Sequence, residues 1–485
     1  MAKQKNEKEF VAEITRREDD ISQWYTDVIL KTDLVDYAPV RGCMVIKPYG
    51  YGIWELMQSE MDARFKATGH QNVYMPMFIP ESLLLKEAEH VEGFAPEVAW
   101  VTQGGSEELP ERLAIRPTSE TMFCAMYSKW VQSWRDLPML YNQWCSVVRW
   151  EKSTRPFLRT SEFLWQEGHT IHATPGEAEE ETLKMLEVYR DFSENVLAIP
   201  VFVGKKSEKE KFAGARATYS MEAMMQDGKA LQAGTSHNFG DNFSKVFDIQ
   251  FLDKDGTRKY VSETSWGTST RMIGGVIMVH GDDRGLVLPP KVAPVQVVIL
   301  PIAQHKEGVL DACYALKARL AARGLRVHVD DRDTQSAGWK FNEWEMKGVP
   351  LRVEIGPRDL ETGQALLMRR DTMEKFGLKL EGLENEVEGI LQSIHDGLYQ
   401  KALAFREGHV TLAANMEELH AGVQNGFVKA MWCGERACED AVKQESSATT
   451  RNMPFDQEAA REGLGERCVC CGKPAQKVIY FAKAY

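Results

Sequence analysis

The sequence predicts a chain of three domains in which helices and strands are mixed, and three observations lead to this prediction. Its 485 residues leave room for roughly three domains. The stretch from Tyr141 to His172 has the pattern of two strands joined by a basic loop, and beyond Pro289 and Pro290 the pattern changes to strand, helix, strand. Five of the nine cysteines lie from Cys433 onward. We therefore expect domains over residues 1–288, 289–405 and 406–485.

Composition and charge exclude several classes of protein. Apolar content of 43% and charged content of 27% are typical of a soluble globular protein. The longest strongly apolar run, Met272 to Val279, is far too short to span a membrane, and the N-terminus lacks a signal peptide's apolar core. A net charge of -12 argues against holding nucleic acid by bulk attraction. We expect a cytoplasmic protein with no membrane partner.

Local basic surfaces remain compatible with the acidic net charge. The candidates are the run Lys205 to Lys211 and the group Arg352, Arg358, Arg369 and Arg370. Either set can also be an ordinary solvated face.

The first part of the chain alternates helical and strand-like patterns. Ile53, Met57 and Met61 recur at helical spacing and predict a helix over Gly52 to Gly69. NVYMPMFIP is rich in strand formers, and its internal proline favours an edge or interface strand. A helix over Glu81 to Glu92 and a loop-rich connection over Val98 to Glu111 follow.

RPTSE, Arg116 to Glu120, opens an apolar helix that we expect to run to about Trp134. Thr118, Ser119 and Glu120 have the residue types of a functional site. They are also the residue types of a helix N-cap with an acid in the first turn.

The predicted hairpin gathers charge on one face. The alternation of side chains along a strand places Gln143, Cys145, Val147, Arg149 and Glu151 together, and Phe163, Trp165, Glu167 and His169 together on the second strand. A buried face with this much charge is costly unless the charges meet each other or a ligand. The alternative is a solvated face carrying an Arg/Glu ladder.

Later segments supply further elements. Thr174-Pro175-Gly176-Glu177 has the form of a capping box that starts a helix. LQAGTSHNFG, Leu231 to Gly240, and WGTSTRMIGG, Trp266 to Gly275, are two further polar segments. In the second domain, strands over Val295 to Leu300, Leu325 to Val329 and Pro350 to Gly356 enclose a helix from Val309 that is closed by Gly324.

The cysteines at the end of the chain have the spacing of a metal site. C-x-x-C-G at Cys468 to Gly472, with a second pair upstream, predicts a closed structural Zn2+ site formed by Cys433, Cys438, Cys468 and Cys471. Cys470 is then the odd thiol. Redox chemistry is the alternative, and a disulfide is disfavoured in a reducing compartment.

Common catalytic motifs are missing from this sequence. It has no G-x-S-x-G, H-E-x-x-H, G-x-x-x-x-G-K-[ST] or G-x-G-x-x-G after a strand. What remains is a set of strands bearing Arg149 and Arg271 with several acids and histidines. The two arginines suit a polyphosphate, and acids near Trp165 suit a small ligand with an ammonium group.

On these residues, the chain resembles the class II aminoacyl-tRNA synthetases, and specifically the prolyl-tRNA synthetases of the archaeal and eukaryotic type. Gly52 to Pro80 resembles motif 1, the dimer element. NQWCSVVRWE with RPFLRTSEFLWQEGHT resembles motif 2, and GTSTR resembles motif 3, although Thr270 stands where generic class II sequences carry Glu. RPTSE, LWQEGH and GTSH are the most family-specific pieces.

The resemblance implies a fold and a reaction. The fold is an α+β catalytic domain built on an antiparallel sheet, followed by an α/β anticodon-binding domain and a small zinc-binding α/β C-terminal domain. The reaction is the ATP-dependent activation of L-proline to prolyl-adenylate and its transfer to the 3' end of tRNA(Pro), a proline–tRNA ligase activity. Its cofactors are ATP with Mg2+ and a structural Zn2+, and the enzyme is a homodimer.

The resemblance also implies roles for individual residues. Arg149 and Arg271 are the expected catalytic residues, at the α-phosphate and γ-phosphate ends of ATP. The ATP-binding set is Arg149, Glu151, Thr160, Gln232, Thr235, Ser269 and Arg271, and the proline-binding set is Thr118, Glu120, Arg149, Trp165, Glu167, His169 and His237.

Three more expectations come from the resemblance. Glu345, Lys347 and Arg352 are candidates for reading bases of an unstacked anticodon. Tyr485, the last residue, should approach the active site. The segment from Gly168 to Gly267 is too short for the editing insertion of the bacterial type, so we expect no editing in cis.

Two alternatives differ in function. One is a synthetase-like RNA-binding or regulatory protein that has lost catalysis, although the retention of Arg149, Glu151 and Arg271 argues against it. The other is a synthetase for another amino acid, such as threonine.

Overall fold

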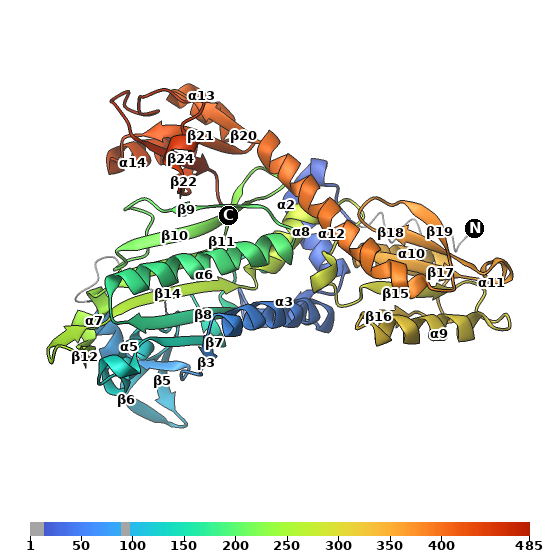
Figure 1. The fold of residues 1–485 in the computed structure, drawn as a ribbon, viewed down its shortest axis with the longest axis horizontal. Coiled ribbons are helices and arrows are strands. Elements are labelled where there is room, and N and C mark those ends of the chain that lie inside the picture. The colour runs from blue at the N-terminus through green and yellow to red at the C-terminus, as the bar shows by residue number, and fades with distance from the viewer. Residues whose placement is uncertain (1–13, 89–97) are drawn as a thin grey trace.

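The computed structural model describes residues 14–88 and 98–485, which form three parts in chain order (Figure 1). The first and largest part is built on an eight-stranded sheet of order β23-β9-β10-β11-β14-β8-β7-β3. All pairs from β9 to β7 are antiparallel, which confirms the predicted antiparallel sheet. Its strands are β3 (Gln71–Asn72), β7 (Met139–Val148), β8 (Glu162–His172), β9 (Val201–Lys205), β10 (Ala217–Met224), β11 (Ala230–Gly240), β14 (Ser262–Ser269) and β23 (Met453–Pro454).

Helix α6 (Pro175–Asn195) lies across this sheet and covers one face of it (Figure 1). It starts with the predicted capping box, in which the backbone N of Glu177 donates to Thr174 Oγ1 at 3.2 Å and the backbone N of Thr174 donates to Glu177 Oε2 at 3.1 Å. The buried side chains of Met185, Tyr189 and Phe192 face the sheet side of the helix. The other helices of this part are α2 (Arg17–Lys31), α3 (Pro48–Ala67), α4 (Glu81–Ala88), α5 (Glu120–Trp130), α7 (Asn242–Phe247) and α8 (Arg271–His280), with a 3-10 turn at Trp134–Asp136.

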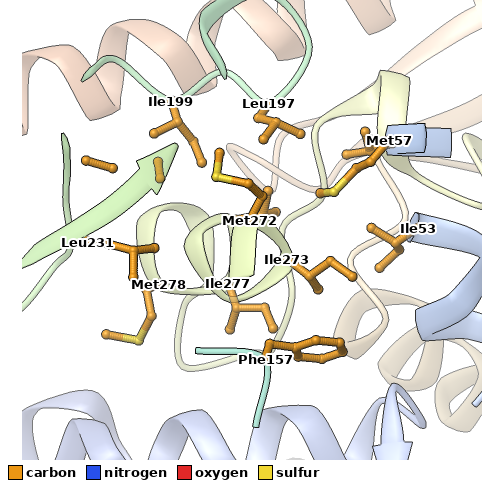
Figure 2. Close-up of a cluster of buried hydrophobic side chains, with 14 of the residues drawn as sticks. Ile53, Met57, Phe157, Leu197, Ile199, Leu231, Met272, Ile273, Ile277 and Met278 are labelled. Carbon is orange, nitrogen blue, oxygen red and sulfur yellow. The ribbon is translucent and has the colours of Figure 1, made fainter. Parts of the chain in front are cut away.

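Helix α8 lies at the centre of the largest apolar core. Figure 2 shows its side chains surrounded by residues of α3, β11 and two loops. Such a helix is apolar on all sides because every side is buried, which explains the apolar run read from the sequence. The core fixes the helix in place, and Arg271 is its first residue. The core residues labelled there are Ile53, Met57, Phe157, Leu197, Ile199, Leu231, Met272, Ile273, Ile277 and Met278.

The prediction of a loop-rich connection over Val98 to Glu111 is wrong. The structure has a hairpin there, β5 (Trp100–Gly104) and β6 (Glu107–Ile115), which forms a small sheet with β4 (Phe78–Pro80). Most hairpin residues are exposed or half-buried, so the strands lack the apolar alternation that marks a strand in sequence. The helix predicted over Glu81 to Glu92 is confirmed as far as Ala88, and the rest of it lies outside the described residues.

The second part contains a five-stranded sheet of order β16-β15-β17-β18-β19, in which β15 pairs parallel with both β16 and β17. It confirms the predicted α/β pattern. The elements are β15 (Val297–Pro301), β16 (Val327–Val329), β17 (Leu351–Ile355), β18 (Gln364–Arg369), β19 (Lys375–Lys379), α9 (Val309–Ala322), α10 (Ala337–Met346), α11 (Pro357–Thr362) and α12 (Leu383–Gly408). The long helix α12 leads from this part to the third (Figure 1).

The third part carries a four-stranded sheet of order β20-β21-β24-β22. Its elements are β20 (Val410–Ala413), β21 (Phe427–Trp432), β22 (Thr449–Thr450), β24 (Lys477–Ala482), α13 (Met416–Gly422), α14 (Arg436–Ser446) and α15 (Gln457–Ala460). One strand of this segment, β23, leaves the small sheet and pairs with β9 of the large sheet, with Met453 opposite Lys205. The third part is therefore built into the edge of the first.

The junction between the first and second parts combines apolar contacts, such as Met346 in the core of the first part, with several polar contacts. Arg370 donates to both carboxylate oxygens of Asp282, at 2.7 and 2.6 Å, and Arg284 donates to Glu345 at 2.7 Å. Tyr49 donates through its hydroxyl to the backbone oxygen of Lys347 at 2.8 Å. Glu345 and Lys347, expected at an anticodon-reading face, thus lie where the second part meets the first.

The predicted basic group of the second part is largely neutralised by neighbouring acids. Arg370 pairs with Asp282, Arg369 pairs with Asp371 at 2.7 Å, and Arg352 pairs with Glu354 at 2.9 Å. We therefore do not regard these three arginines as a free phosphate-binding surface. None of the helices in the described ranges is long and apolar enough to cross a membrane.

Candidate active site

A pocket opens over the middle strands of the large sheet. Of the predicted site residues, it is lined by Thr118, Glu120, Arg149, Trp165, Glu167, His169, Gln232, Thr235, His237, Ser269 and Arg271. The predicted hairpin is confirmed, and its register explains the grouping because Gln143 pairs with Glu167 and Cys145 with Trp165. Strand β14 continues the surface, with Gly267 opposite Glu167. Residues far apart in sequence thus share one face.

One end of the pocket holds a buried acid cluster. Glu167 accepts hydrogen bonds from Gln143 Nε2 at 2.6 Å and from the backbone N of Ser119 at 3.1 Å, and His169 Nε2 lies 3.0 Å from its Oε2. Thr118 donates to the carboxylate of Glu120. Ser119 is at the N-cap of α5, where its side chain makes no cap hydrogen bond. The segment RPTSE therefore starts helix α5 and also supplies residues of the acid cluster.

Burial sets the protonation states in this cluster. It raises the pKa of Glu120, and the neighbouring charge of Glu167 adds to the rise although His169 opposes it. Burial alone would also raise the pKa of Glu167, but its hydrogen bond from His169 brings this pKa below the usual value. We infer an ionised Glu167 paired with a protonated His169. Glu120 is then the carboxyl group whose ionisation a bound cation would favour.

His237 closes the same end of the pocket and is neutral. Its Nδ1 lies 3.0 Å from Thr218 Oγ1. Burial, together with the positive charges of Lys206 and His169, lowers the pKa of His237 to about 3.

Two arginines of the pocket are anchored by neutral groups, and Arg149 lies close enough to the acid cluster to interact with the charges of Glu120 and Glu167. Arg149 Nε donates to the backbone oxygen of Pro117 at 3.1 Å, and Arg271 Nε donates to that of Leu158 at 3.0 Å. Burial and the nearby charges of Arg149 and Arg159 lower the pKa of Arg271 to about 10. Among the residues that the structure describes, no carboxylate forms an ion pair with Arg149 or Arg271, as a site for a polyanion requires.

The indole of Trp165 packs against Gly267 on the pocket surface. A Cβ added at Gly267 would lie 3.4 Å from the Trp165 ring. Trp165 Nε1 donates to Cys145 Sγ at 3.2 Å, which fixes the indole on this face. A flat ligand can lie on such a surface.

Two predicted ATP residues do not line the pocket. Strand β7 ends at Val148, so Glu151 lies in the following loop, where its carboxylate is 4.0 Å from Arg159. Placing Arg149 and Glu151 within the first strand was therefore wrong, because both follow its last residue, Val148. Thr160 donates from Oγ1 to the backbone oxygen of Glu162 at 2.8 Å.

The prediction missed several lining residues, chiefly Phe163, Lys206, Glu210, Phe212, Thr218 and Thr268. Phe163 was placed on the correct strand face but given no role. Lys206 belonged to a basic run that we also read as a solvated face, and its side chain is buried instead. Charge runs in sequence do not show which member turns inward.

The cysteines of the third part gather as predicted. Sγ atoms of Cys433, Cys438, Cys468 and Cys471 all lie within 4.8 Å of one another, and Cys470 is not among them. The Cys433–Cys438 and Cys433–Cys471 Sγ distances are 3.5 and 3.9 Å. A tetrahedral zinc with bonds of about 2.3 Å would place its sulfurs about 3.8 Å apart. The four thiols fit a zinc ion by donor type and by spacing.

The C-terminus docks beside the large sheet. The backbone N of Tyr485 donates to the backbone oxygen of Ala230 at 3.2 Å, and its hydroxyl bonds to Asp227. The guanidinium of Arg155, in the loop between β7 and β8, lies 5.3 Å from the centre of the Tyr485 ring. Tyr485 thus reaches the motif 2 loop and the strand that carries Gln232.

Comparison with known proteins identifies this arrangement. Residues 100–280 match the family described as tRNA synthetase class II core domain (G, H, P, S and T), and residues 296–390 match the anticodon binding domain. Residues 416–485 match the prolyl-tRNA synthetase C-terminal family. The chain is 64% identical over 483 residues to the proline–tRNA ligase of Alkaliphilus oremlandii, covering 99% of this chain and 100% of that one. This chain belongs to the prolyl-tRNA synthetase family.

Two further relatives agree with this family assignment. The proline–tRNA ligase of Ruminiclostridium cellulolyticum is 63% identical over 481 residues, covering 99% of both chains. A crystal structure of prolyl-tRNA synthetase from Cryptosporidium parvum, complexed with halofuginone and AMPPNP, matches with a TM-score of 0.92. It is 41% identical and covers 97% of this chain and 99% of its own. As a member of this family, the chain is an aminoacyl-tRNA synthetase.

The segment between the expected motifs 2 and 3 belongs to the catalytic fold of this synthetase. Residues 168–267 are all described, and they form strands of the large sheet, α6, α7 and a short hairpin of β12 (Gln250–Leu252) and β13 (Arg258–Tyr260). The absence of editing in cis stays a prediction. Assignment to the archaeal and eukaryotic type stays a prediction.

Proposed function

We propose that this synthetase activates L-proline with ATP to form prolyl-adenylate and transfers the prolyl group to the 3' end of tRNA(Pro). Family membership over the whole chain supports the activity. The observation that supports the chemistry is that one pocket is lined both by the buried carboxylates of Glu120 and Glu167 and by the arginines Arg149 and Arg271. An amino acid carries an ammonium and a carboxylate, and ATP carries the phosphates, so both substrates have a complementary end.

The reaction needs positioning more than proton transfer. The carboxylate of proline is already ionised at neutral pH, so it can attack the α-phosphorus of ATP without a general base and expel pyrophosphate. Catalysis then rests on alignment of the two substrates and on cations placed where negative charge increases. Mg2+ accompanies ATP by bridging its phosphates. In the second step the terminal ribose hydroxyl of tRNA attacks the adenylate.

We assign roles by the end of the pocket in which each residue lies. Arg149 holds the α-phosphate and the proline carboxylate, and Arg271 holds the γ-phosphate end. The nucleotide lies against Gln232, Thr235 and Ser269. The proline pocket comprises Thr118, Glu120, Trp165, Glu167, His169 and His237, with Trp165 as a flat wall for the ring.

Replacing Glu120 by glutamine should weaken proline binding selectively. The amide keeps the size of the side chain but removes the charge that pairs with the proline ammonium. Charge-assisted hydrogen bonds contribute about 1.5 to 3 kcal/mol, so the KM for proline should rise roughly 10- to 100-fold while that for ATP changes little. Exchange kinetics with each substrate varied in turn measure both. An equal rise in both constants would contradict the assignment.

A panel of amino acids tests the function itself. Exchange of labelled pyrophosphate into ATP should depend strongly on proline, with threonine, alanine and cysteine as competitors. A hydrophobic pocket discriminates by only about 10- to 200-fold per methylene, so some activity with alanine and cysteine is expected. Preference for threonine would overturn the assignment of proline. No exchange with any amino acid from folded protein would favour the regulatory alternative.

We also propose that the enzyme is a homodimer that works in the cytoplasm. Tyr74, Met77 and Phe78 are 68%, 36% and 45% exposed near β3 and β4, in the segment that resembles motif 1. Burying such an apolar group against a second copy is favourable. All nine cysteines are free thiols, which suits a reducing compartment. Light scattering should give twice the chain mass of 55.0 kDa, and a monomer mass at micromolar concentration would contradict the dimer.

The second and third parts complete the proposal. The second binds the anticodon of tRNA(Pro), through residues other than those that face the junction. The third holds Zn2+ with Cys433, Cys438, Cys468 and Cys471, and the metal supplies folding energy there and no catalytic step.

A further inference from the structure

Lys206 is the one buried lysine that lines the described pocket, and none of the predicted roles includes it. It follows directly after β9, and its backbone N donates to the backbone oxygen of Thr218 at 2.8 Å. The residue is only 7% exposed, although it lies in a run of lysines. Its Nζ donates to the amide oxygen of Gln232 on β11. The ammonium therefore points across the sheet into the site.

The charge of Lys206 has no counter-ion of its own. Within the part of the chain that the structure describes, no carboxylate lies within ion-pair distance of it. The acids whose charges act most on Lys206 are Glu222 and Glu210. Glu222 is fully buried and accepts two hydrogen bonds on one oxygen from Arg451, at 2.7 and 3.1 Å, and Glu210 lines the same pocket as Lys206. Lys206 is thus anchored by a neutral group, as Arg149 and Arg271 are. A buried cation in this state is costly until an anion arrives.

The position of Lys206 identifies which anion it meets. Gln232, its partner, also accepts a hydrogen bond at its backbone oxygen from Arg271 Nη1 at 3.4 Å, at the phosphate end. On the other side, the positive charge of Lys206 contributes to the lowered pKa of His237 at the proline end. Lys206 therefore lies between Arg271 and His237, where the proposed substrate assignment brings the proline carboxylate and the α-phosphate together.

We propose that Lys206 is a further catalytic residue of this synthetase, whose ammonium pairs with the α-phosphate oxygens as the proline carboxylate adds to the phosphorus. The assignment rests on the proposed function. In this step a bond forms between a carboxylate oxygen and the α-phosphorus, and the bond to pyrophosphate breaks. Negative charge increases on the α-phosphate oxygens in the transition state, and a fixed cation in a buried site stabilises it.

The third part of the chain holds Lys206 in this position. Met453 of strand β23 pairs with Lys205, the last residue of β9 and the neighbour of Lys206. Arg451 and Asn452, which come directly before β23 in the chain, contact residues of the large sheet. Asn452 Nδ2 donates to the backbone oxygens of Phe202 and Ser220 at 3.1 and 3.2 Å. Both hydrogen bonds of Arg451 go to Oε2 of Glu222, so Arg451 competes with Lys206 for this carboxylate, whose Oε1 has no hydrogen-bond partner. Arg451 is thus a positioning residue.

Lys206→Met tests the proposal, since methionine keeps the length of the side chain and removes the charge. The maximal rate of proline-dependent pyrophosphate exchange should fall about 10²-fold, as when one transition-state donor is lost. Lys206→Arg should recover part of that rate. Lys211→Met is the matched control, because that lysine pairs with exposed Glu208 in the same segment and should leave the rate unchanged. Melting temperatures show whether each variant is folded.

The outcomes separate the possible roles. A wild-type rate in folded Lys206→Met would overturn the proposal. A loss of thermal stability with an unchanged rate per folded molecule would also overturn it, because Lys206 would then have a structural role. A rise in the KM for proline alone would overturn it as well, because Lys206 would then only bind proline. If the unmodified enzyme shows no proline-dependent exchange while it is folded, the proposed function fails first. If the unmodified enzyme shows proline-dependent exchange and Lys206→Met has the same rate, only the proposed role of Lys206 is wrong.

Discussion

Replacing Arg149 by alanine should lower the rate of prolyl-adenylate formation by about 10²-fold or more, the largest effect we expect from one substitution. Arg149 is anchored by the backbone oxygen of Pro117 and lies 5.4 Å from the centre of the Trp165 ring, so its free donors face both expected substrates. It is expected to hold the α-phosphate and the proline carboxylate together. Its loss therefore removes alignment as well as charge.

The Arg149 experiment needs two companions. Arg149→Lys should recover only part of the rate, because a lysine is a point charge and cannot reproduce the planar, two-pronged donor geometry. Arg190→Ala is a control for loss of an arginine, since that side chain pairs with Glu187 on the exposed side of α6. Pyrophosphate exchange measures all three without tRNA. An unchanged rate in Arg149→Ala would remove this arginine from the mechanism.

Replacing Cys433 by serine should release zinc and loosen the third part of the chain. A structural zinc supplies folding free energy on the order of 10 kcal/mol, and the third part has only a small apolar core of its own. We expect metal analysis to give less than one zinc per chain. Limited proteolysis should cut between residues 433 and 471.

Cys470→Ser is the matched control for the zinc site. Cys470 is adjacent to Cys471 but outside the four-thiol cluster, so this variant should keep its zinc and its protease resistance. One zinc per chain in Cys433→Ser would contradict the ligand assignment. A wild-type chain purified without zinc but with a Cys433–Cys438 disulfide would favour the redox alternative. Arg451 lies in the chain between Cys438 and Cys468, so loosening of this segment on zinc loss should weaken its contact with Glu222. Because we propose that this contact positions Lys206, zinc loss should also slow pyrophosphate exchange.

Local sequence patterns anticipated much of the candidate site. The alternation in β7 and β8 placed Gln143 and Glu167 on one face, and the structure pairs them directly. The capping box at Thr174 and the strand and helix of the second part also follow from short-range rules. The zinc cluster follows from spacing because each cysteine pair closes a local turn. These features depend on residues close together in the chain.

Features that depend on contacts between distant segments were not predictable. The β5–β6 hairpin is solvated, so it carries no apolar alternation. Glu345, Lys347 and Arg370 have the composition of an RNA-binding face, but Arg284, Tyr49 and Asp282 of the first part contact them. Whether a surface charge is free depends on what packs against it, which the local sequence does not encode.

By itself, the sequence determined the family, the two-ended character of the site and the cysteine set, because these depend on residue types at fixed spacing. Only the tertiary structure decided which charges are buried and which are neutralised. In the structure, Lys206 is buried although it belongs to a run of lysines, Glu151 lies outside the pocket, and Arg451 from the third part pairs with Glu222. Burial and charge pairing depend on the folded surroundings, since the same side chain costs little in water and much in an apolar interior.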